Sequence, residues 1–202
     1  MSLWSVSDHG RAIVATIDGG GINSLDEEAL TGLAALLDQV AGDDGVRALV
    51  LTGAGSTFCL GLDIDLLGRA FADHHMHFGI LPGGGASARL PRRIGTQQAR
   101  ELLLTGRWLT GPEVADYGLA LRSVPGDQLR EATLDLVAGL VDKPRASLGR
   151  LKQLLDDQDG LSLEDACRIE REHFRRFLEE EPLADDGYRA FVEQRAPAWQ
   201  AE

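Results

Sequence analysis

The chain has 202 residues, of which 44% are hydrophobic and 26% are charged, and these fractions are typical of a globular protein rather than a disordered one. Its formal net charge of −12 argues against a nucleic-acid partner, because a polyanion binds to a concentrated basic face. We therefore expect one globular unit that is long enough to bury a sizeable core.

Cysteine usage and the distribution of apolar residues both favour a cytoplasmic protein. The two cysteines, Cys59 and Cys167, are far apart in the sequence, and such sparse use is typical of a reducing compartment. No apolar run approaches the roughly 18 residues that a membrane-spanning helix needs. The first four residues also lack the basic-then-apolar pattern of a signal peptide. The sequence thus predicts a cytoplasmic location and no membrane partner.

The first predicted elements form a strand–helix–strand unit. Residues 13–17 are apolar and largely β-branched, as in a buried strand, and three glycines follow them. We expect Ser24 to cap the next helix, with Glu27 as its reciprocal partner. Residues 46–52 form a second apolar strand. A strand, helix and strand of these lengths predict a right-handed βαβ unit, which begins an α/β fold.

A glycine-rich turn follows the second strand. Gly53, Gly55 and Gly61 permit backbone angles that would strain other residues, so the chain can turn tightly at the carboxyl end of the strand. Ligands bind at that end of a parallel sheet. Such a turn can direct consecutive main-chain N–H groups at one point. Donors of this kind suit a thioester oxygen that becomes negative during a reaction.

The rest of the chain is predicted to be mostly helical. Residues 97–104 form a helix, a capping box at residues 110–113 opens another, and residues 121–124 form a short strand. Further helices are expected near 129–142, 144–157 and 162–180. The change in composition near residues 125–130 divides the chain into an α/β core, residues 1–125, and a helical region, residues 126–202.

Taken in order, the glycine motifs resemble those of the crotonase (enoyl-CoA hydratase/isomerase) family. Residues 53–63 have the pattern G-x-G-x-x-F-C-x-G-x-D of its first oxyanion-hole motif, and residues 23–25 resemble its Asn-Ala-Leu. Further likenesses lie in Leu-Pro-Gly-Gly-Gly at 81–85, Leu-Thr-Gly at 104–106, Gly-Leu at 118–119 and the C-terminal segment 187–199. The resemblance covers nearly the whole chain. It implies a crotonase-like ββα spiral core followed by a C-terminal helical region.

One part of the family pattern is missing from the middle of the chain. Crotonases place another strand and a Gly-Gly-Gly helix start between the Gly-x-Asp turn and the Pro-Gly-Gly-Gly segment, and that helix donates the second oxyanion-hole N–H. Here only residues 64–78 lie between Asp63 and Gly79. Since one βα connection already needs about 10–12 residues, the second donor and the glutamate after it are expected to be absent. The core is therefore predicted to be shortened.

The second glutamate of the family is also replaced. Aligning on residues 78–82 puts His74 and His75 at the family's Pro-Glu pair. Histidine exchanges protons near neutral pH, so His75 could replace the carboxylate as acid or base; the alternative is a surface turn that has drifted. His74, His75 and His77 also suggest a metal site. That hypothesis is disfavoured, because no cysteine or acidic residue stands at a recognised ligand spacing.

By resemblance, the ligand is an acyl-CoA thioester, and no cofactor is implied beyond the CoA of the substrate. The Leu62 N–H would donate to the thioester oxygen. The residues expected to line the acyl-CoA site are Ser24, Leu60, Leu62, Asp63, Ile64, Pro82 and Gly83. The arginines near the Pro-Gly-Gly-Gly segment are candidates for phosphate contacts, although a solvated helix face explains them equally well: Arg89, Arg92, Arg93 and Arg107.

The leading hypothesis is an enoyl-CoA hydratase/isomerase-like protein that binds an acyl-CoA and hydrates a 2-enoyl-CoA or shifts its double bond. The alternative is a shortened, catalytically silent homologue that binds acyl-CoA or forms oligomers, and a damaged gene product is a third reading. Crotonases pack their terminal helices against neighbouring subunits. The resemblance therefore implies a homo-oligomer, a trimer or a dimer of trimers, although apolar periodicity alone would equally allow packing within one chain.

Overall fold

The computed structural model describes residues 3–21, 23–59, 72–197 and 199. Its sheet has the order β1-β2-β3: β1 (Trp4–His9) pairs antiparallel with β2 (Ala12–Ile17), and β2 pairs parallel with β3 (Ala48–Gly53). Helix α1 (Glu27–Gly42) connects the two parallel strands. The predicted strand–helix–strand unit is therefore confirmed. Strand β1 was not predicted, because only its first residue is buried and its pattern is largely polar.

Helix α1 begins later than the sequence predicted. Its N-cap is Asp26, whose carboxylate accepts a hydrogen bond of 2.9 Å from the Ala29 N–H. The expected cap, Ser24, is wrong. Asn23 adopts a left-handed backbone conformation, with φ of 47°, so the chain is still turning at that point and becomes helical only after the aspartate.

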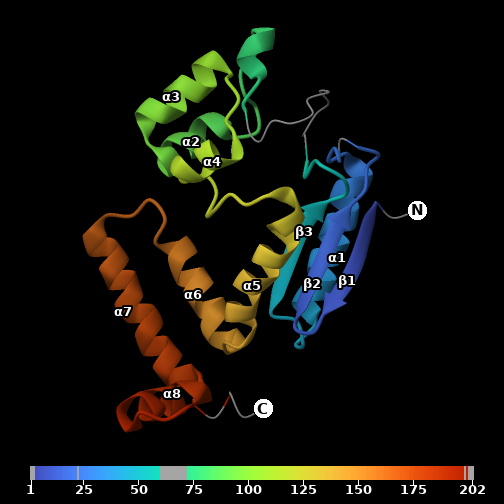
Figure 1. The fold of residues 1–202 in the computed structure, drawn as a ribbon. Helices are drawn as coiled ribbons and strands as arrows, with labels where there is room; N and C mark the ends of the chain where they lie inside the picture. Colours follow the sequence, from blue (N-terminus) through green and yellow to red (C-terminus); the bar gives the residue numbers. More distant parts are fainter. Residues whose placement is uncertain (1–2, 22, 60–71, 198, 200–202) are drawn as a thin grey trace.

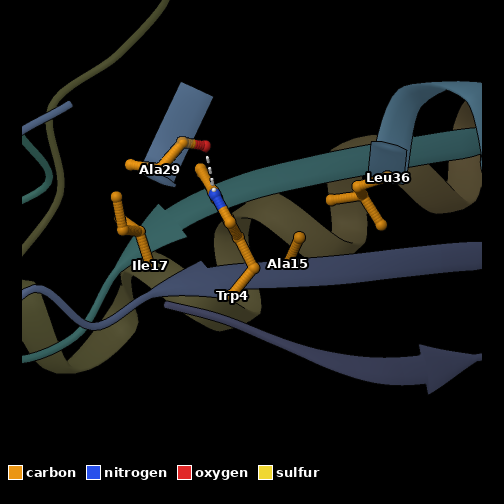
Figure 2. Close-up of a cluster of buried hydrophobic side chains, with 5 residues drawn as sticks. All are labelled: Trp4, Ala15, Ile17, Ala29 and Leu36. Atoms are coloured by element: carbon orange, nitrogen blue, oxygen red, sulfur yellow. Dashed lines mark hydrogen bonds between the residues drawn. The ribbon is translucent and has the colours of Figure 1, made fainter. Parts of the chain in front are cut away.

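A buried cluster joins α1 to the sheet. Trp4, Ala15, Ile17, Ala29 and Leu36 form this core, and Figure 2 shows the Trp4 ring reaching from β1 to the helix. Its indole Nε1 donates a hydrogen bond of 2.9 Å to the Ala29 carbonyl. The indole therefore fills the space between the two layers and also satisfies its polar edge.

The middle of the chain forms a helical group with a core of its own. It contains the 3₁₀ turn η1 (His75–Phe78) and helices α2 (Ala86–Ile94), α3 (Thr96–Thr105) and α4 (Gly111–Asp116). The helix predicted at 97–104 and the capping box of Thr110 and Glu113 are confirmed. The core of this group consists of Leu90, Ile94, Ala99, Leu102 and Leu109.

The strand predicted at residues 121–124 is wrong. The structure has a bend followed by irregular chain there, and Leu121 is largely exposed. A strand needs a hydrogen-bonded neighbour, and within the described residues the sheet pairs β1, β2 and β3 only. Local apolar character therefore did not suffice to make a strand.

The C-terminal part consists of η2 (Gly126–Gln128), α5 (Leu129–Val141), α6 (Arg145–Asp157), α7 (Leu163–Glu180) and α8 (Pro182–Glu193). The three predicted helices are confirmed, and α8 is an addition that starts at a proline. Figure 1 shows α5 beside β3, with α6 and α7 farther from the sheet. Within the described part of the chain, no helix is long and apolar enough to span a bilayer. The division into 1–125 and 126–202 stays a prediction.

Candidate active site at the carboxyl end of β3

The turn after β3 is as tight as its glycines suggested. A Cβ on Gly53 would lie 2.2 Å from the Thr57 carbonyl oxygen and 2.5 Å from that of Phe58, so no other residue fits there without moving the backbone. Gly55 has a φ of +73°, which favours glycine. The chain therefore folds back closely on the end of the strand.

Asn23 holds this turn in place. It is fully buried, and its Nδ2 donates to the Thr57 carbonyl at 2.6 Å and to the Ala54 carbonyl at 3.0 Å. Its Oδ1 accepts from the Gly19 N–H at 3.0 Å. The loop after β2 is thus tied to the loop after β3. In the sequence, Asn23 was only one residue of a motif, because its hydrogen bond to Thr57 joins positions 34 residues apart.

A cavity of about 410 Å³ lies between this turn, the end of β3 and the start of α5. This volume is within the range of small-ligand sites, about 300–1,000 Å³. Apolar side chains make up much of its wall, and hydroxyls and one guanidinium supply polar groups. It is lined by Val14, Val50, Leu51, Thr52, Gly53, Gly55, Ser56, Thr57, Phe58, Gly126, Leu129, Arg130, Thr133 and Leu134.

His75 forms a pair with a buried carboxylate. Its Nδ1 lies 2.9 Å from Asp73 Oδ1, and its backbone N–H donates to the same oxygen at 3.3 Å. The Asp73 side chain is almost fully buried, whereas that of His75 is 39% exposed. When Nδ1 carries the proton that Asp73 accepts, Nε2 presents its lone pair and can receive a proton. Asp73 was not singled out in the sequence, although an aspartate two residues before the histidine was a local signal.

The two neighbouring histidines pack η1 onto the helical group. The His74 ring meets the Trp108 ring edge-on at a centroid distance of 4.6 Å and lies 4.7 Å from the His77 ring. His77 Nε2 lies 3.1 Å from the Gly106 carbonyl oxygen. These contacts give His74 and His77 packing roles. Within the described residues, no cluster of three or more His, Cys, Asp or Glu side chains could hold a metal ion.

The family model described as enoyl-CoA hydratase/isomerase matches residues 69–202, which is well over half of the chain. The chain belongs to the enoyl-CoA hydratase/isomerase family. A probable enoyl-CoA hydratase of Bacillus subtilis is 27% identical, with 94% of this chain and 95% of that protein covered. Probable enoyl-CoA hydratases of Dictyostelium discoideum and Mycobacterium bovis are 30% and 36% identical over 73% and 63% of this chain.

Solved structures bear out the crotonase-like α/β fold. An enoyl-CoA hydratase structure from Geobacillus kaustophilus HTA426 superposes with a TM-score of 0.87 at 22% identity, covering 99% of this chain and 98% of that one. A probable enoyl-CoA hydratase/isomerase from Mycobacterium abscessus superposes with a TM-score of 0.83 at 25% identity, and both chains are fully covered.

The chain and its relatives differ in length. The alignment with the Bacillus relative runs over 246 positions, more than the 202 residues of this chain, so that relative contains residues without a counterpart here. The chain spans 53% of the Dictyostelium relative and 49% of the Mycobacterium bovis relative. The alignment does not locate those residues, so the shortened middle of the chain stays a prediction.

The predicted site residues fall into two groups in this family member. Leu60, Leu62, Asp63 and Ile64 lie outside the described residues, as does most of the segment where a second oxyanion donor was expected to be missing. The other predicted residues are described, but they do not line the cavity beside β3: Ser24, His75, Pro82 and Gly83. The structure therefore does not bring His75 and the turn after β3 together through its described residues.

One of the four candidate arginines, Arg107, pairs with carboxylates of its own chain. Arg107 donates to Glu101 at 2.7 Å, to Glu113 at 3.1 Å and to the Tyr117 hydroxyl at 2.7 Å. The Glu101 and Glu113 carboxylates raise the pKa of Arg107. The pKa of Glu113 falls to about 2, because the Thr110 N–H and hydroxyl, and then Arg107, donate to its carboxylate. Arg107 therefore connects α3 to α4, and its donors are already engaged.

Proposed function

We propose that this protein binds an acyl-CoA thioester beside β3 and hydrates a 2-enoyl-CoA. The observation that carries the proposal is the cavity at the carboxyl end of β3, closed by a turn that only glycine permits at residue 53 and that Asn23 fixes. Membership of the enoyl-CoA hydratase/isomerase family supports the same ligand class. A rigid turn at such a strand end is a suitable frame for main-chain donors to a thioester oxygen.

The proposed roles follow the chemistry of hydration, and they require η1 and the turn after β3 to meet around the bound substrate. His75 Nε2 takes a proton from water, the water oxygen bonds to C3, and the double-bond electrons move to the thioester oxygen as an enolate. The Leu62 N–H donates to that oxygen, and the imidazolium then returns its proton to C2. Only water and the thioester are consumed, so no separate cofactor is needed. The proposed acyl-CoA contacts remain Ser24, Leu60, Leu62, Asp63, Ile64, Pro82 and Gly83.

A homo-oligomer, either a trimer or a hexamer, belongs to the same proposal. Large apolar side chains stay exposed on the C-terminal helices, and a second copy of the chain would cover them. They include Leu151, Leu155, Phe174, Leu178, Tyr188 and Phe191. A cytoplasmic location is also proposed, and the sparse use of cysteine supports it.

The test uses the purified full chain with crotonyl-CoA, with the ultraviolet absorbance of the enoyl thioester as the readout. We expect His75→Ala to lower kcat by roughly 10²–10⁴, the usual contribution of a general acid or base. His173→Ala is a matched control, because His173 also pairs with an aspartate, Asp157 at 3.0 Å, but lies on α7. It should keep the wild-type rate.

Calorimetric titration with acetyl-CoA separates the other outcomes. Binding without turnover would identify the chain as a silent acyl-CoA-binding homologue. Absence of both binding and turnover would contradict the proposal as a whole. Equal turnover in wild type and His75→Ala would keep the hydratase but remove His75 from its mechanism.

A further inference from the structure

An arginine that has no carboxylate partner among the described residues lines the cavity beside β3. Arg130 is the second residue of α5, and its Nη2 lies 2.7 Å from His9 Nε2 at the end of β1. Arginine only donates hydrogen bonds, so His9 Nε2 accepts and the imidazole is neutral in this contact. The partner of Arg130 therefore leaves the positive charge of the guanidinium uncompensated.

No carboxylate of the described chain compensates it either. Asp127 and Glu131 lie close to Arg130 in the sequence, but neither forms an ion pair with it. No other described carboxylate lies within 4.0 Å of its guanidinium nitrogens. Other described arginines, such as Arg11, Arg122 and Arg171, also form no ion pair, but none of them lines the cavity beside β3. Most arginines of the C-terminal part do pair with carboxylates: Arg145, Arg150, Arg168, Arg175, Arg176, Arg189 and Arg195.

Strand register places the contact of Arg130 with His9 away from the glycine turn. His9 pairs with Ala12, which lies beside Ala48 at the start of β3, while the turn follows Gly53 at the other end. Five residues of strand separate the two levels, which is roughly 16 Å at 3.3 Å per residue. Val14 and Val50, which pair between these levels, are apolar parts of the wall. A ligand that runs along the cavity would thus meet the glycine turn, then apolar surface, then a cation.

We propose that Arg130 binds a carboxylate at the far end of the acyl chain, so that the preferred substrates are mono-CoA thioesters of unsaturated dicarboxylic acids. This inference rests on the proposed function. Arg130 is exposed at this end of the cavity, so its guanidinium is accessible to a ligand, and a carboxylate matches its forked donors. The phosphates of CoA are a second source of negative charge, and the experiment separates the two.

The test compares two thioesters of equal chain length, trans-2-hexenedioyl-CoA and trans-2-hexenoyl-CoA, which differ only in a terminal carboxylate or methyl group. We expect wild type to favour the dicarboxylic substrate by roughly 10- to 100-fold in kcat/KM, as for a hydrogen bond between charged groups. Arg130→Gln should abolish that preference, and Arg130→Lys should retain part of it. Arg171→Gln, which removes an exposed arginine from α7, should leave the ratio unchanged.

Other results would overturn the inference. If Arg130→Gln weakened both substrates equally, Arg130 would contact a CoA phosphate, which the two thioesters share. If wild type turned over both substrates without a preference, the result would support the hydratase activity but refute the carboxylate site. If neither substrate was turned over, titration with adipoyl-CoA and hexanoyl-CoA would decide. Tighter binding of adipoyl-CoA that depends on Arg130 would support the carboxylate site. Absence of binding of either thioester would refute both the site and the proposed function.

Discussion

Two helical regions of this protein differ in how far their apolar side chains are buried. Helices α2, α3 and α4 close around their own core, in which Ala99 and Leu102 are completely buried. Helices α6 and α7 contain no buried residue at all, although they pack on each other along an apolar groove. Phe174, on the wall of that groove, is 61% exposed.

The difference shows where each region obtains its stability. The α2–α4 group has both side-chain packing and a polar network, because Arg107 joins α3 to the capping box of α4. The surface of α7 instead carries ion pairs between neighbouring turns, such as those of Arg175 with Glu172 and Glu179. Exposed pairs of this kind contribute little to stability. We therefore expect substitutions in the first region to change folding, and those in the second to change association.

The largest effect is expected from Leu102→Ala. The side chain is fully buried in the core of the α2–α4 group, so its truncation removes apolar contacts and leaves a cavity. The free energy of unfolding should fall by about 2–5 kcal/mol. Urea unfolding measures this. The control is Leu104→Ala on the same helix, where the side chain is 65% exposed; a comparable loss there would contradict the assignment of the core.

A smaller and pH-dependent effect is expected from Glu113→Gln. The pKa of Glu113 is lowered from its ordinary 4.5 to about 2 in the folded chain, chiefly by hydrogen bonds from Thr110 and then from Arg107. A lowered pKa stabilises the fold above the unfolded value, and this contribution is lost as the pH falls from about 4.5 to about 2. Wild type should therefore be more stable than the variant at pH 7, and the two should converge near pH 2.

Urea midpoints at several pH values test this convergence. Glu164→Gln is the control, since Glu164 is an exposed carboxylate in the first turn of α7 and belongs to no ion pair among the described residues. A difference between wild type and Glu113→Gln that stayed constant down to pH 2 would show that the carboxylate charge is not what stabilises α4.

The sequence predicted those parts of the fold in which local signals agree. The βαβ unit and the helices near 129–142, 144–157 and 162–180 have strong periodicity or clear caps, and the structure contains them. Strand β1 was missed because the antiparallel pairing with β2, rather than its own pattern, makes it a strand. The opposite error was made at 121–124, where apolar residues have no strand beside them among the described residues.

The site was less predictable because its contacts are distant in sequence. Asn23 donates a hydrogen bond to the Thr57 carbonyl, and Arg130 contacts His9, which is 121 positions away. Neither contact can be predicted from a local pattern. The pairing of Asp73 with His75 was easier to predict, since the two residues are only two positions apart. The glycines of the turn after β3 were predictable because tight turns require them, and the structure shows why at Gly53.

The smallest effect on folding is expected from Phe174→Ser, which tests whether the groove between α6 and α7 is covered by another copy of the chain. Because the ring is mostly exposed, its loss should change the free energy of unfolding of a single, unassociated chain by about 0.5 kcal/mol or less. If copies of the chain cover this groove, the wild-type urea midpoint rises with protein concentration, since assembly stabilises the folded form by mass action. Phe174→Ser should flatten that rise, whereas Leu102→Ala should lower the midpoint at every concentration. A midpoint independent of concentration in wild type would mean that α6 and α7 remain exposed, and the contrast between the two regions would then not depend on assembly.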